Sequence, residues 1–141
     1  MPADNLPLHW RLRAGLAALV IPPLIHIVPL HRLARRLGRG HAGAAGPPDA
    51  SAAAWIDAVL RQLPWPWHHT CLKRAAVLYH LLRRDGNPVE LQIGVRRTPA
   101  GTLAAHAWLV REGAPYLEEG SENIAGFTPL ARFPEAPVAD R

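Results

Sequence analysis

Residues 68–79 read HHTCLKRAAVLY and contain Cys71, the only cysteine in a chain of 141 residues. Thr70 is a good helix N-cap, because its hydroxyl can accept a hydrogen bond from a free amide of the first turn. Residues 85–88 (DGNP) end the run, and Gly86 suits a left-handed C-terminal cap. Between these two signals, apolar residues recur at helical spacing: Leu72, Ala75, Ala76, Tyr79 and Leu82. The pattern predicts a helix of about four turns with Cys71 at its first or second residue.

The expected position of Cys71 favours nucleophilic chemistry. The free amides and the dipole at a helix start stabilise a thiolate, which is the nucleophilic form of cysteine. A lone cysteine is more often a small buried hydrophobic residue, so the hypothesis needs a base and an oxyanion site nearby. The backbone amide of Cys71 is one candidate oxyanion donor. The candidate residues for a second donor or a substrate cleft are Trp67, His69 and Trp108.

Turn residues separate the segments that follow this helix, and four strands are expected there. Their ranges are 89–95, 103–110, 116–118 and 127–134. The first of them alternates apolar and other side chains, as a half-buried strand does. Pro129 restricts the last one to an edge or an end of the sheet. These strands predict a small antiparallel sheet beside the helix.

His106, in the second expected strand, is the candidate base. Side chains alternate along a strand, so His106 and Trp108 share one face while Ala107 lies on the other. If the helix packs across the sheet, one face brings His106 towards Cys71. A carboxylate of Glu118 on the third strand could then hold the imidazole and fix its tautomer.

Five segments, taken in order, resemble one family. They are CLKR at 71–74, LLRRDG at 81–86, IGVR at 93–96, AHAW at 105–108 and FTPLARF at 127–133. The resemblance is to the transglutaminase-like leader peptidases of lasso-peptide biosynthesis, in the form where the peptidase is a separate chain from its leader-binding partner. It covers about residues 52–134 and, more loosely, the N-terminal helical region.

The resemblance implies a Cys-His-Asp type triad that cleaves a leader peptide from a ribosomally made precursor. Carried over by position, Cys71 is the nucleophile, His106 is the base, and the third position falls on or near Glu118. The family usually has Asp at that place, and Glu is one methylene longer. The alternatives for the third position are Glu119, Glu122 and Asn123. The implied partners are the precursor leader peptide, a small leader-recognition protein and a downstream ATP-dependent lasso cyclase.

The expected fold class is α+β, with a papain-like or transglutaminase-like core in which the nucleophile helix packs on the sheet. Residues 49–141 are predicted to form this peptidase domain, and residues 1–48 a basic and apolar helical arm with a linker. A helix over 52–63 is expected to follow, capped by Asp49 or Ser51.

Within the arm, Pro22-Pro23 is predicted to break the apolar run into short helices, which argues against a membrane span. The favoured interpretation is that these helices pack on the core domain. The alternatives are a membrane-surface anchor or a docking face for the protein that presents the leader.

Composition restricts the remaining function classes. One cysteine excludes an internal disulfide and fits a reducing compartment, so a cytoplasmic protein is expected, with membrane association through the arm as the alternative. The formal charge of +5 suits an acidic partner, but no nucleic-acid-binding motif is present. His68, His69 and Cys71 lack a second pair of ligands, so neither a metal nor another cofactor is expected.

Two rival functions stay open on the residues alone. The first is a non-hydrolytic acyl transfer, such as amidation or amide exchange, at the same Cys71–His106 site. The second is a non-enzymatic adaptor whose arm binds a membrane or a protein partner.

Overall fold

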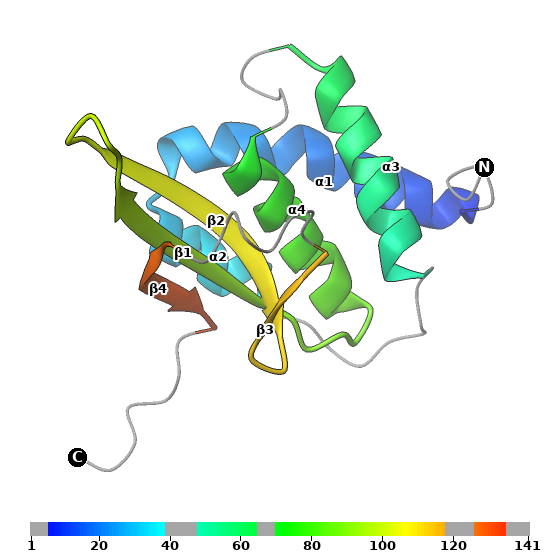
Figure 1. The fold of residues 1–141 in the computed structure, drawn as a ribbon. Coiled ribbons are helices and arrows are strands. Elements are labelled where there is room, and N and C mark those ends of the chain that lie inside the picture. Colours follow the sequence, from blue (N-terminus) through cyan, green and yellow to red (C-terminus); the bar gives the residue numbers. More distant parts are fainter. Residues whose placement is uncertain (1–5, 39–47, 65–69, 118–125, 135–141) are drawn as a thin grey trace.

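A computed structural model describes residues 6–38, 48–64, 70–117 and 126–134 of the chain. The elements are α1 (Leu8–Ile27), α2 (Leu30–Leu37), α3 (Asp49–Gln62), α4 (Cys71–Arg84), β1 (Glu90–Arg97), β2 (Leu103–Arg111), β3 (Ala114–Tyr116) and β4 (Thr128–Phe133). The four strands form one antiparallel sheet in the order β3-β2-β1-β4. The expected α+β class, with a helix that begins at Cys71 packed on a small antiparallel sheet, is confirmed (Figure 1).

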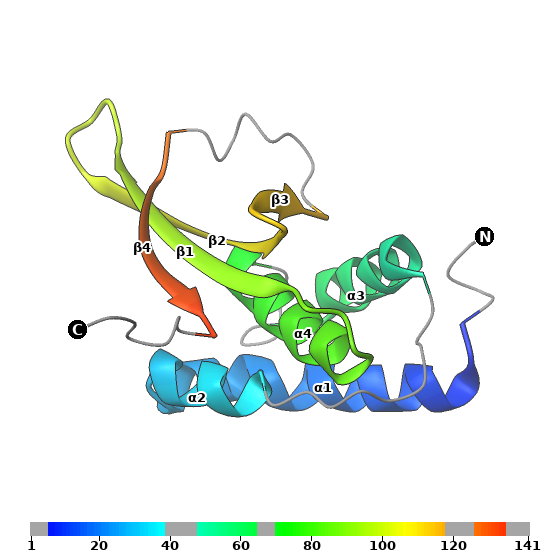
Figure 2. The ribbon, with the colours of Figure 1, turned by 90° about the horizontal axis from the view of Figure 1, so that it is seen from below.

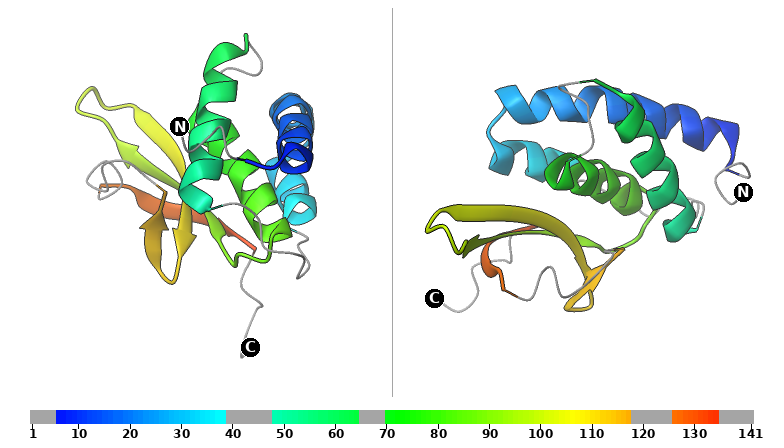
Figure 3. Two further views of the ribbon diagram at one scale, coloured as in Figure 1. Left: turned by 90° about the vertical axis from the view of Figure 1, so that its right-hand side faces the viewer. Right: turned by 45° about the horizontal axis from the view of Figure 1, so that its top comes forward.

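The elements lie in three layers. Figure 2 shows the sheet on one side, α4 and α3 in the middle, and α1 with α2 on the side away from the sheet. The same arrangement is seen from two further directions in Figure 3. Helix α4 is therefore covered on two sides, and its residues Ala75–Tyr79 are buried without a break. One hydrophobic core joins α1, α2, α3, α4 and the near face of the sheet.

The two ends of α4 are determined locally, as the sequence predicts. At its start, the Lys73 amide donates to Thr70 Oγ1 at 3.3 Å. At its end, the amides of Gly86 and Asn87 donate back to the carbonyls of Arg83 and Leu82 at 3.1 and 2.9 Å. Gly86 has a φ of +88°, which completes a Schellman cap that favours glycine.

The register of β1 and β2 assigns side chains to the two faces of the sheet. Leu91 pairs with Leu109 and Ile93 with Ala107, and all four side chains belong to the core that α4 shares. On the other face, Trp108 and Val110 form a separate small cluster, against which Phe127 packs. The sheet thus has apolar residues on both faces, although only one of the two faces contacts α4.

The predicted break at Pro22-Pro23 is wrong, because α1 continues through both prolines to Ile27. Proline removes a ladder donor and disfavours the helical conformation of the residue before it. Burial of Ile21 and Pro22 in the core offsets this local cost. The chain leaves the helix only at Val28, which is extended and precedes Pro29 at the start of α2.

Helix α1 is long and apolar enough to cross a membrane by length and composition alone, with a mean hydropathy of 1.2. A core helix of a soluble protein passes the same test, and 33% of the stretch is buried inside this protein. The expectation that the arm packs on the core is confirmed, since residues of α1 and α2 share the core of α4. The boundary between residues 48 and 49 stays a prediction.

Two further expectations need correction. Helix α3 begins at Asp49 itself, with Pro48 at the N-cap and no side-chain cap from Asp49 or Ser51. The Asp49 carboxylate instead accepts hydrogen bonds from Asn87 Nδ2 and the Tyr116 hydroxyl. The third strand ends at Tyr116 rather than starting there, because the tight turn at Glu112 and Gly113 begins pairing early, at Ala114.

Candidate active site

Cys71 is the first residue of α4, as the sequence predicts, and it is half-buried. Thr70 satisfies the amide of Lys73, and its carbonyl accepts from the amide of Arg74 at 2.9 Å. The amides of Cys71 and Leu72 precede the first intrahelical hydrogen bond, so the helix ladder does not use them. This end of α4 therefore offers backbone donors, and the positive end of the helix dipole, at the thiol.

Two basic residues lie in the first turn of α4, directly after the thiol. Lys73 is buried, with 3% of its surface exposed, and this burial lowers its pKa. Lysine is seldom buried to this degree, so the sequence alone does not predict that Lys73 lies inside the protein. With Arg74 next to it, the turn that begins at Cys71 has basic side chains and no acidic one.

Arg74 ties the start of α4 to two other elements. Its Nε donates to Asp57 Oδ1 on α3 at 2.8 Å, and its Nη2 donates to the Leu117 carbonyl at 2.7 Å. The two charged side chains are only 13% and 18% exposed, so this ion pair is partly shielded from water. From the sequence, Arg74 was as compatible with a solvated surface pair as with a site residue.

Leu117, which follows β3, holds a left-handed backbone with a φ of +59°. A non-glycine residue in that region carries strain, which the surrounding structure must offset. The hydrogen bond from Arg74 and the packing of Leu117 against the core provide that support. Arg74 therefore positions the chain immediately before residue 118.

The predicted third member of the triad lies outside the described residues. This holds for Glu118 and for its alternatives Glu119, Glu122 and Asn123. Trp67 and His69, the candidates for a second oxyanion donor or the substrate cleft, also lie outside the part of the chain that the structure describes.

His106 lies in the middle of β2, paired with Gly94 of β1. Its ring stacks on Trp108, with ring centres 5.6 Å apart and planes 21° apart. The ring of Phe127 is 5.5 Å away on a tilted plane. Arg96 places its guanidinium 4.9 Å from the centre of the Phe127 ring, at the edge of this aromatic group.

Trp108 is buried against the His106 ring and does not line an open surface. It is 4% exposed, and its ring passes over Gly94, where an added Cβ would come within 2.8 Å of the indole. The absence of a side chain at Gly94 thus leaves room for the indole. His106 stacks against this fixed ring, which restricts where the imidazole can point.

The faces of the sheet decide how the thiol and the imidazole are related. Helix α4 packs on the face that carries Ala107 and Leu109, and His106 alternates with them onto the other face. Packing of α4 on the sheet therefore does not by itself decide whether His106 reaches Cys71, and their pairing stays a prediction. The His106 ring contacts Trp108 and Phe127 on the face away from α4. The catalytic roles of Cys71 and His106 stay predictions.

No metal site takes the place of this pair in the described residues. No group of three His, Cys, Asp or Glu side chains among them lies close enough to hold an ion.

Comparison with known protein families gives a match over most of the chain. Residues 15–132 match the family model described as the transglutaminase-like superfamily. The match begins within α1, ends within β4 and includes both Cys71 and His106. No curated protein and no solved structure matches the chain.

Proposed function

Because this chain belongs to the transglutaminase-like superfamily, whose members are typically cysteine-based enzymes, we propose that it is a cysteine peptidase with Cys71 as nucleophile. We further propose that its substrate is a ribosomally made lasso-peptide precursor, from which it removes the leader peptide. The family match supports the assignment as a cysteine-based enzyme. The five ordered segments between residues 71 and 133 support the choice of substrate.

The observation that carries the proposal is the place of Cys71 at the capped start of the central helix, within the matched region. Amides outside the helix ladder, together with the helix dipole, stabilise both a thiolate and the oxyanion that its attack creates. The same turn carries no acidic side chain, and the charge of Arg74 is paired with Asp57 on α3. A cysteine that served only to fill the core would not require this position.

The proposed reaction has two steps. The Cys71 thiol gives its proton to His106, and the resulting thiolate attacks the carbonyl carbon of the leader–core amide. The tetrahedral intermediate collapses as His106 gives this proton to the leaving amine of the core. The leader remains as a thioester on Cys71. His106 then takes a proton from water, and the resulting hydroxide releases the leader as a free acid. Glu118 is proposed to hold the imidazole in the required tautomer.

The reaction requires the imidazole within hydrogen-bonding distance of the sulfur or of a bridging water. In the structure the ring is stacked on Trp108. Catalytic hydrogen bonds often form only once substrate is bound, so the proposal includes a movement of the His106 ring off the indole. Cleavage then presents a core with a new N-terminal amine, which the partner cyclase joins to a side-chain carboxylate.

The test is cleavage of the precursor in the presence of the leader-recognition protein, followed by mass spectrometry. Hydrolysis adds one water to the leader fragment. We expect Cys71→Ala to abolish cleavage while keeping the circular dichroism of the folded chain, and His106→Gln to lower the rate by about 10²–10⁴-fold. His9→Gln is the matched control, because His9 is exposed at the start of α1. This variant should cleave the precursor normally. Cleavage by Cys71→Ala would overturn the proposal.

A second measurement on the same variants addresses the geometry. Cys71 is the only cysteine, so alkylation by iodoacetamide reports on one sulfur. If His106 reaches the thiol, His106→Gln should slow alkylation near neutral pH, whereas His9→Gln should not. Equal alkylation rates together with lost cleavage would assign His106 to the substrate side of the reaction. Full activity of Glu118→Gln would remove that residue from the triad.

A non-hydrolytic acyl transfer would use the same thioester, and the superfamily match accommodates it equally. The same mass spectrum distinguishes the two reactions, because transfer to an amine leaves the leader fragment without the added water.

A further inference from the structure

The outer face of α1 is apolar and uncovered. Its large side chains are 45–75% exposed. They are Leu8, Leu12, Leu16, Leu19, Val20 and Ile27. Their spacing places them on one side of the helix. We call this set the α1 ridge.

A surface helix ordinarily carries polar residues on its outer face, but the outer face of α1 is mainly apolar, with His9 and His26 as its exposed polar side chains in the described helix. Its inner face holds Trp10, Ala14 and Ile21 in the core that it shares with α4. The same helix therefore needs a second apolar or amphipathic environment on the outside. The inner contacts also argue against a span, because a helix crossing the bilayer could not keep Trp10 and Ile21 in the protein core.

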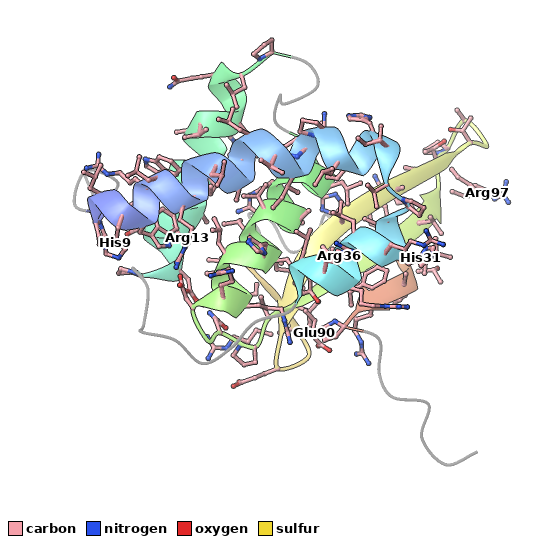
Figure 4. All side chains as sticks on the ribbon, turned by 180° about the vertical axis from the view of Figure 1, so that it is seen from behind. His9, Arg13, His31, Arg36, Glu90 and Arg97 are labelled. Carbon is pink, nitrogen blue, oxygen red and sulfur yellow. The ribbon has the colours of Figure 1, made fainter. Side chains whose placement is uncertain are left out.

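Basic side chains accompany the ridge in the same outer layer. Helix α2 buries Leu33, Ala34 and Leu37. On its opposite side it exposes His31, Arg32, Arg35 and Arg36. Figure 4, seen from behind, shows α1 and α2 together in front of α4 and the sheet, with His31 and Arg36 on α2. The whole segment from residue 8 to 38 contains no Asp or Glu.

From this combination we infer that the chain docks on an anionic lipid bilayer through α1 and α2. Helix α1 lies parallel to the membrane plane, with the α1 ridge inserted at the boundary between headgroups and acyl chains. The arginines of α2 contact lipid phosphates. A protein partner for this face would need an apolar centre and an acidic rim, whereas an anionic bilayer supplies an apolar layer and negative charge together.

The test is flotation of the full chain with vesicles of phosphatidylcholine alone or mixed with phosphatidylglycerol. We expect binding to the mixed vesicles, weaker binding to the neutral ones, and a decrease as salt is raised. The double variant Leu12→Glu, Leu16→Glu should lose binding. Its matched control is Leu103→Glu, Leu130→Glu, since these leucines are 67% and 68% exposed on the sheet, and it should bind normally.

A second pair of variants tests the charge. Arg36→Gln should weaken binding to the mixed vesicles about fivefold, which corresponds to the contribution of one basic residue at an anionic surface. Arg97→Gln, at the far end of the sheet in Figure 4, should leave binding unchanged. Near-native circular dichroism of every variant is the control for folding.

The outcomes are exclusive. Absence of wild-type binding to the mixed vesicles, or normal binding by the Leu12→Glu, Leu16→Glu variant, overturns the inference. The inference is also overturned if the wild-type chain is dimeric by light scattering and does not bind vesicles, while the double variant is monomeric. In that case the α1 ridge is a contact between copies. The inference is independent of catalysis, so Cys71→Ala should float with the mixed vesicles like the wild type.

Discussion

At the scale of single residues, Tyr79 shows how tightly the core surrounds α4. Its side chain is fully buried, and its hydroxyl has no hydrogen-bond partner in the described structure. Burial is the main cause that raises the pKa of Tyr79 to about 12. Gly38, at the end of α2, has no room for a side chain, since an added Cβ would lie 3.0 Å from the ring carbon Cζ.

The two tyrosines of the chain provide a matched comparison. Tyr79→Phe removes an unpaired buried hydroxyl, so the free energy of unfolding should stay unchanged or rise by up to about 1 kcal/mol. Tyr116→Phe removes the hydrogen bond to the Asp49 carboxylate and should lower it by about 1–3 kcal/mol. Urea denaturation followed by circular dichroism measures both. A loss for Tyr79→Phe as large as for Tyr116→Phe would mean that the buried hydroxyl has a partner.

At the scale of elements, the sheet depends on the close approach of Trp108 to Gly94. The indole fills the place where a side chain of residue 94 would lie, and the Thr128 carbonyl is 3.0 Å from the same point. This contact joins β1, β2 and β4 on the face away from α4.

Gly94→Ala should therefore destabilise the protein by about 1–3 kcal/mol, since the backbone on one side and a buried ring on the other cannot both yield. Gly15→Ala is the contrasting substitution. There the nearest side-chain atom is 3.8 Å from the added Cβ, and alanine should stabilise the helix by about 0.5–1 kcal/mol. Thermal unfolding of both variants measures the difference. A Gly94→Ala chain as stable as the wild type would show that Trp108 moves freely.

The elements also show what the sequence predicts and why it stops there. The ends of α4 are predicted correctly, because Thr70 and Gly86 act within one turn of the residues they cap. The course of α1 is not, because burial of Ile21 and Pro22 by distant residues offsets the local preference of proline. The early pairing of β3 likewise depends on β2, its partner across the turn.

At the scale of the whole molecule, His80 connects the layers. It lies on α4, and its Nδ1 is 3.2 Å from the Leu37 carbonyl of α2. Burial, with smaller effects from Arg84 and Arg13, lowers the pKa of His80 below its ordinary value of 6.5, while the contact with Leu37 opposes the shift. The folded state thus disfavours a proton that the unfolded chain accepts.

The free energy of unfolding should therefore fall as pH is lowered from about 6.5 through the pKa of folded His80, and level off below it. The sign follows because the unfolded state binds more protons in that range. His80→Gln should reduce this slope, whereas His9→Gln, at an exposed position, should keep it. Urea midpoints measured between pH 7 and 4.5 would check this. An equal slope in the wild type and the His80→Gln variant would contradict it.

For the candidate site, too, the sequence predicts local positions but not how distant elements come together. The helical position of Cys71 and the strand position of His106 follow from local patterns, and both are confirmed. Which face of the sheet receives α4 depends on the assembled core, and no pattern within β2 could decide it. The buried position of Lys73 and the link from Arg74 to Asp57 and Leu117 also arise only when three elements meet.

That link has an evolutionary consequence. One planar guanidinium serves a carboxylate on α3 and a strained carbonyl after β3, and the single ammonium of a lysine is a poor substitute for both directions at once. Descendants of this chain are thus free to exchange the residues around the thiol only while Asp57 and Arg74 are inherited as a pair, because any residue at position 117 supplies the carbonyl. Drift at one of the two would have to be answered at the other before the lineage could explore a new reaction.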